Sequence, residues 1–150
     1  MFERNFSWLQ SFWLASLLLC FSLPLSASEA KPFAEHHVVL QISDDDPNTQ
    51  VLVLNVAGNL LKLYGEDKVD IEIVAFNRGL RLLFEDNSEA DRIASLSSSG
   101  VRFAACNVTM AGMSRVLGHE PVLNPKATRV PGGVGRILEL VGEGYVLIRP

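Results

Sequence analysis

Cys106 is the residue of this sequence best placed to do chemistry. It stands where an apolar segment, residues 101–105, gives way to Asn107-Val108-Thr109. A thiol at such a strand-to-helix junction faces a helix N-terminus, which favours the thiolate and lowers the pKa from the free value of about 8.5. The alternative interpretation is inert packing, because free cysteine is among the most buried residue types and the sequence fixes no base for the thiol.

The other cysteine, Cys20, lies in a segment typical of a secretory signal peptide. A basic residue precedes the apolar run 12–21, and small residues follow at 26–30. The run is nearer ten residues than the roughly 20 needed to span a bilayer, and the small-residue exit resembles a cleavage site. We therefore expect a cleaved signal peptide over residues 1–27, a periplasmic protein, and no stable membrane anchor after cleavage.

Removal of the signal would leave Cys106 as the solitary thiol. An odd cysteine in an oxidising compartment either pairs between molecules or is kept for reactivity. The remaining chain is long enough for one domain with its own core. Its net charge of -4 gives no electrostatic footprint for nucleic acid or anionic lipid, so small molecules or proteins are the expected partners.

The elements that must position Cys106 follow a strand-helix alternation after a polar lead at 28–37. The pattern predicts an α/β domain over 38–150 with a mainly parallel sheet and right-handed crossovers. The expected strands are 38–42, 69–76, 101–105, 127–130 and 145–148, and the expected helices are 47–64, 89–97, 108–117 and one that opens at Pro131-Gly132-Gly133. Ser88 is expected to cap the second helix, and the last helix to carry Val134, Ile137, Leu138 and Val141 on one face.

The first predicted helix is apolar around most of its circumference. Asp46 is placed to cap it, Pro47 to occupy its first position and Gly65 to end it. Its polar residues form one narrow stripe, and the apolar surface that remains is larger than a single sheet face can bury. The excess apolar surface predicts a subunit interface, with Gly58 permitting close approach; a helix merely more apolar than usual is the alternative.

Ligands of open α/β sheets bind just beyond the carboxyl ends of the strands. That rule gathers a set of polar and small residues around Cys106, the candidate nucleophile. The candidate substrate-binding residues are Ser43 and Asp44 after the first strand, Asn77 and Arg78 after the second, Asn107 after the third, and Pro131 and Gly132 after the fourth.

Other motifs are weaker. The acidic run 44–46 could hold a hard cation, but helix capping and a solvated loop explain it as well. The segment 133–138 starts like a dinucleotide fingerprint and lacks its third glycine. His119 could approach the thiol as a base, although a loop histidine is usually solvated. Neither a metal nor a cofactor is expected.

Four segments together resemble the DsrE/DsrF-like family. They are the first strand into Ser43-Asp44-Asp45-Asp46-Pro47, the segment 73–80, the cysteine segment 100–110 and the ending 144–150. The resemblance implies a three-layer α/β/α fold with a five-stranded parallel sheet, flavodoxin-like in outline, and assembly into homo-oligomers, trimers or hexamers. It also implies that a cysteine matching Cys106 accepts sulfane sulfur as a persulfide and hands it to a partner protein.

Three hypotheses for function follow. The first is a periplasmic sulfur-handling protein, a sulfurtransferase or sulfur carrier that works between donor and acceptor proteins through Cys106. The second is a non-enzymatic oligomeric module of the same fold that binds a small molecule or a protein while its thiol merely packs. The third is a metal-dependent enzyme using Asp44 and Asp45.

Overall fold

The computed structural model describes residues 30–150, so the predicted signal peptide and Cys20 lie outside the described residues. Ten elements follow one another: β1 His36–Ile42, α1 Pro47–Tyr64, β2 Val69–Ala75, the 3-10 helix η1 Asn77–Leu83, α2 Ala90–Ser98, β3 Arg102–Cys106, α3 Asn107–Leu117, β4 Ala127–Val130, α4 Gly133–Gly142 and β5 Val146–Ile148. Within this range no helix is long and apolar enough to cross a membrane.

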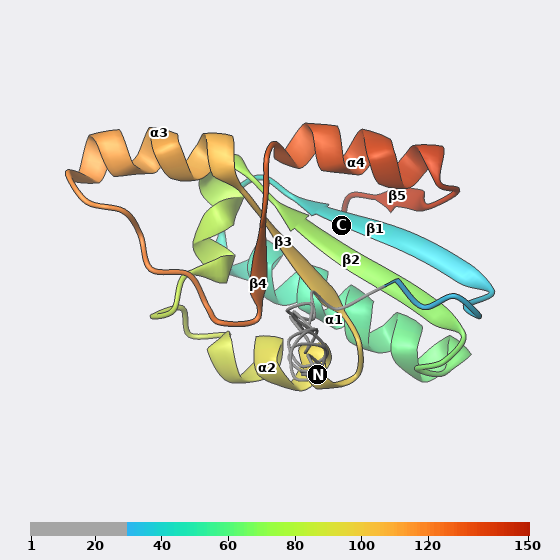
Figure 1. Cartoon of the computed structure of the whole chain (residues 1–150). Coiled ribbons are helices and arrows are strands. Elements are labelled where there is room, and N and C mark those ends of the chain that lie inside the picture. The colour runs from blue at the N-terminus through green and yellow to red at the C-terminus, as the bar shows by residue number, and fades with distance from the viewer. Residues whose placement is uncertain (1–29) are drawn as a thin grey trace, which may run out of the picture.

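All five strands pair in parallel, in the order β4-β3-β2-β1-β5. The chain adds strands in one direction from β1 to β4 and then returns to pair β5 with the free edge of β1. Figure 1 shows α1 and α2 on one side of the sheet and α3 and α4 on the other. The predicted α/β class and the three-layer arrangement are confirmed.

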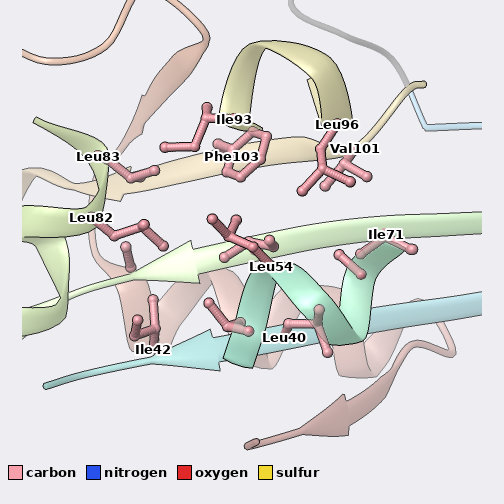
Figure 2. Close-up of a cluster of buried hydrophobic side chains, with 14 of the residues drawn as sticks. Leu40, Ile42, Leu54, Ile71, Leu82, Leu83, Ile93, Leu96, Val101 and Phe103 are labelled. Carbon is pink, nitrogen blue, oxygen red and sulfur yellow. The ribbon is translucent and has the colours of Figure 1, made fainter. Parts of the chain in front are cut away.

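The larger core lies between the sheet and the pair α1 and α2. Alternate residues of the three central strands point into it, as strand geometry requires. Leu40, Ile71 and Phe103 come from β1, β2 and β3 and pack with Leu54 of α1 and Ile93 of α2 (Figure 2). Each such side chain contributes about 1.5–3 kcal/mol on burial, so this layer fixes how the strands are aligned.

A smaller core lies on the opposite face of the sheet, under α4. Val39, Val74 and Ala104 point into it from β1, β2 and β3, and Ile137 and Leu140 cover them from α4. Residue 106 has the same parity as residue 104 along β3. The thiol therefore belongs to the α4 side of the sheet.

The first helix begins and ends where the sequence predicts. The Asp46 carboxylate accepts the Thr49 N–H at 3.1 Å, and Pro47 occupies the first turn. The helix ends at Gly65, whose φ of +91° lies in the region that favours glycine. Its buried side includes Val53, Leu54, Ala57 and Leu61, while Leu52 and Leu63 are exposed.

Two local predictions are wrong. The second helix begins at Ala90, so its N-cap is Glu89 and not Ser88, and no side chain caps it. Asn87 accepts the Glu89 N–H at 2.9 Å in the turn before the helix. The last helix buries Ile137 and Leu140, and three residues assigned to the same face are exposed: Val134, Leu138 and Val141. The apolar face of this helix is wider than the strip that meets the sheet, so periodicity alone could not identify which of its residues are buried.

Candidate functional site

Two helix N-termini meet at Cys106. This residue ends β3 and is the N-cap of α3, and its neighbour across the sheet is Val130, the last residue of β4. Three residues later the chain enters α4 at Gly133. Figure 1 shows α3 and α4 leading away in opposite directions from the carboxyl ends of these two strands. The positive ends of both helix dipoles are therefore directed at the thiol.

The surroundings of the sulfur favour its ionised form. Burial alone raises the pKa of Cys106, which is only 5% exposed. Hydrogen bonds from the Thr109 hydroxyl and from the backbone amides of Thr109, Gly133 and Val108 outweigh this effect, and the pKa lies below its ordinary value. The geometry agrees with this direction, because Cys106 is the N-cap of α3 and Gly133, at the start of α4, packs against it. Chemically, this arrangement suits a nucleophilic thiolate.

Thr109 is held in place by the loop after the neighbouring strand. Its Oγ1 accepts the backbone N–H of Asn77 at 3.0 Å. The same hydroxyl lowers the pKa of Cys106. Asn77 has a φ of +50°, the left-handed conformation that asparagine tolerates better than most residues. Asn77, which the sequence predicts to bind the ligand, is therefore linked to the thiol through Thr109.

Glycines let the chain approach the site from two sides. A Cβ atom on Gly79 would lie 2.6 Å from the Ile42 carbonyl oxygen, so only glycine lets η1 pack against the end of β1. A Cβ atom on Gly133 would lie 2.9 Å from Cβ of Phe76 and 3.3 Å from Cβ of Cys106. These contacts set the positions of η1 and of the α4 N-terminus around the sulfur.

The predicted site residues all lie at the carboxyl edge of the sheet, but only some surround the thiol. Asn77 reaches it through Thr109, and Gly132 immediately precedes the amide that contacts the sulfur. Ser43 and Asp44 follow β1, and Asp44 accepts the Asp46 N–H at 3.2 Å. Arg78 pairs with Asp45 at 3.3 Å, Asn107 is exposed, and Pro131 and Gly132 line a separate cavity.

The acidic run is explained by local interactions. Asp45 lies between Arg78 and Arg81, at 3.3 and 3.9 Å, while Asp46 caps α1. Within residues 30–150, no group of three or more histidine, cysteine, aspartate or glutamate side chains could hold a metal ion. His119 lies exposed in its loop, with Nδ1 3.3 Å from the carbonyl oxygen of Glu120.

A buried ionic network below the thiol was not predicted from the sequence. Arg102 donates to Asp70 and, at 3.0 Å, to both Glu72 and the Tyr145 hydroxyl. The Tyr145 hydroxyl in turn donates to Asp70 at 2.6 Å. Arg136 of α4 donates to both oxygens of Glu72, at 2.7 and 2.9 Å. The network therefore ties α4 to β2 and fixes the helix whose N-terminus contacts Cys106.

Two cavities flank this region. The larger, about 480 Å³, runs along β3 and β4 and has Glu72, Arg102 and Arg136 in its wall. The smaller, about 370 Å³, lies between η1 and α3. Asn77 and Thr109, the pair connected to the sulfur, line the smaller cavity.

Comparison with solved structures gives a relative that spans the described domain. The chain is similar to MTH1491, a protein of unknown function from Methanobacterium thermoautotrophicum, with 32% sequence identity and a TM-score of 0.68. The match covers 77% of this chain and 99% of the archaeal chain. No protein-family model and no curated protein matches the sequence.

Proposed function

Because the chain belongs to the same family as MTH1491, whose own function is unknown, we propose a function from the chain's own site: Cys106 accepts sulfane sulfur as a persulfide and passes it on. In this role the protein is a sulfur carrier or sulfurtransferase. The observation that carries the proposal is the position of Cys106 at the N-termini of α3 and α4, where the Thr109 hydroxyl and three backbone amides lower its pKa.

A sulfur carrier needs a thiol that is both nucleophilic and protected. The amides and the hydroxyl favour the thiolate, which is the form that attacks sulfane sulfur. The same donors would stabilise a persulfide anion once the sulfur has been transferred. The 5% exposure of Cys106 would limit access by large oxidants and by unrelated thiols. The resemblance of segment 100–110 to the DsrE/DsrF-like family supports the same reading.

The direct test is sulfur transfer to a single thiol. The full chain carrying Cys20→Ser keeps Cys106 as its only cysteine. Incubation with thiosulfate or polysulfide is expected to add the mass of sulfur, detected by intact-mass spectrometry and removed by a reductant. The matched control adds Cys106→Ser and is expected to remain unmodified. An unmodified Cys106 protein, shown to be folded by circular dichroism, would contradict the proposal.

Location and assembly belong to the same proposal. The N-terminal segment supports export to the periplasm, where the carrier would meet its donor and acceptor proteins. Exposed apolar side chains support a homo-oligomer, a trimer or hexamer; beyond those of α1, they include Val116 on α3 and Val134 and Leu138 on α4. Cell fractionation and light scattering of the purified protein test these two points.

The larger cavity favours a second candidate function, a binding module in which the thiol only packs. This cavity of about 480 Å³ has charged groups in its wall and is not lined by Cys106. In that case Cys106→Ala would preserve ligand binding and assembly, and would reduce stability only. Retained sulfur transfer by the wild type and its loss in Cys106→Ala would favour the carrier instead.

A further inference from the structure

The groove between η1 and α3 has the composition of a site for an organic anion. Its cavity of about 370 Å³ has an apolar wall, made by Phe84, Met113, Val116 and Leu117, and a cationic side with Arg78 and Arg81. Ligand sites commonly combine an apolar wall with a few polar groups that fix orientation. Inorganic thiosulfate would leave this apolar wall uncovered.

Arg78 and Arg81 can still bind an anion although both lie near Asp45. Asp45 lies 3.3 Å from Arg78 and 3.9 Å from Arg81, so one carboxylate faces two guanidinium groups. The arginine side chains remain 67% and 58% exposed. A guanidinium has five N–H donors in a planar fork that matches a carboxylate. The cationic side of the groove therefore has unused donors and a net positive charge.

The groove is connected to the thiol by two residues of its wall. Thr109 lines the cavity and its hydroxyl lowers the pKa of Cys106, and Asn77 lines the cavity and donates its backbone N–H to Thr109. Cys106 itself is 5% exposed and is not among the residues that line the groove. A molecule held by the arginines and the apolar wall would have to pass Asn77 and Thr109 to reach the sulfur.

We propose that this groove binds the sulfur donor, and that the donor is an organic persulfide bearing a carboxylate, either an amino-acid or a short-peptide persulfide. The inference rests on the proposed function of Cys106. In the transfer, the Cys106 thiolate attacks the terminal sulfur of R–S–SH and forms the new S–S bond. The donor S–S bond breaks and R–S⁻ leaves with its electron pair, while the transferred sulfur keeps its proton.

The test compares two donors that differ only in the carboxylate, N-acetylcysteine persulfide and N-acetylcysteamine persulfide. The full chain with Cys20→Ser is the reference protein, and persulfide formation on Cys106 is followed by mass spectrometry. Arg78→Gln with Arg81→Gln is expected to lower kcat/KM for the carboxylated donor by roughly tenfold or more, and to leave the uncharged donor unchanged. A cysteine-containing tripeptide persulfide distinguishes a peptide donor from an amino-acid donor.

Two further variants make the result specific. Arg115→Gln removes one charge from α3 outside the groove lining and is expected to change neither donor. Gly112→Leu fills the groove, since open space surrounds that glycine, and is expected to slow both organic donors but not inorganic polysulfide. Equal rates for the two donors in every variant would overturn the groove proposal. Failure of all donors, polysulfide included, would instead overturn the function of Cys106.

Discussion

Gly133 and Cys106 lie so close that a Cβ atom on the glycine would be 3.3 Å from Cβ of the cysteine and 2.9 Å from Cβ of Phe76. This contact joins the start of α4 to the end of β3. It is also the contact through which a Gly133 amide reaches the sulfur. The surroundings of the thiol thus depend on residue 133, in another element, being a glycine.

Gly133→Ala is expected to raise the pKa of Cys106 and to lower the stability of the fold. The new methyl group must displace Phe76 or shift the α4 N-terminus, and either movement withdraws one amide from the sulfur. Destabilisation of about 1–3 kcal/mol is expected from overpacking, together with slower alkylation of Cys106 at neutral pH. Gly135→Ala is the control, since nothing lies within 4 Å of that position. Equal alkylation rates in both variants would contradict the assigned contact.

Thr109→Val should raise the pKa of Cys106 by removing the hydroxyl donor while preserving the shape of the side chain. Thr109→Ser keeps the hydroxyl and should retain the low pKa. The measurement is the pH profile of iodoacetamide alkylation, whose midpoint in the wild type is expected below the roughly 8.5 of a free thiol. Identical midpoints for valine and serine would show that Thr109 does not act on the sulfur.

The same lowered pKa has a consequence for stability. A thiol whose pKa is lower in the folded state stabilises the fold when ionised. This contribution is complete above the unfolded pKa of about 8.5 and is lost as pH falls through the folded value. Cys106→Ser should therefore flatten the pH dependence of denaturation midpoints in this window. An unchanged slope would contradict the prediction.

Arg102→Met is expected to destabilise the domain by about 3–5 kcal/mol, because it leaves Asp70 and Glu72 as buried carboxylates with fewer partners. Urea denaturation measures the change. Lys68→Met removes an exposed ion pair to Glu35 and serves as the control, with little change expected. A small effect of Arg102→Met would mean that Arg136 and Tyr145 satisfy both carboxylates without it.

Alkaline pH should destabilise the protein through Tyr145. Burial first, and then its hydrogen bond to Asp70, raises the pKa of Tyr145 to about 12. Since the folded pKa exceeds the unfolded value near 10, stability is complete below about pH 10 and falls as pH rises toward 12. Tyr145→Phe should lose this fall in stability with rising pH, whereas Tyr64→Phe should keep it. Thermal melts between pH 9 and 12 distinguish them.

Local chemistry in the sequence accounts for most of the fold. Asp46, Pro47 and Gly65 predict both ends of α1, because capping and backbone conformation are decided within a few residues. Segments rich in β-branched residues likewise predict strands from neighbouring residues alone. The pattern of β2 predicts a strand, but it does not indicate that its polar residues Asp70 and Glu72 are buried. Their partner Arg102 comes from β3, which no local pattern indicates.

Part of the candidate site could likewise be predicted from the sequence, and part could not. The position of Cys106 at the carboxyl edge follows from the strand pattern and the rule for open sheets. The donors around its sulfur do not, because Gly133 arrives from β4 and α4 and Asn77 acts only through Thr109. Thr109 had one usable signal, a polar side chain three residues after a helix N-cap, the position from which capping-box side chains bond back to the cap.

The amide of Gly133 connects the reactivity of Cys106 to the completion of folding. An unfolded chain lacks this donor and the helix dipoles, so its thiol has the nucleophilicity of ordinary cysteine. Activation then requires that the last third of the chain be synthesised and that α4 be docked on the sheet through Arg136 and Glu72. A partly folded chain would thus carry a thiol of ordinary pKa.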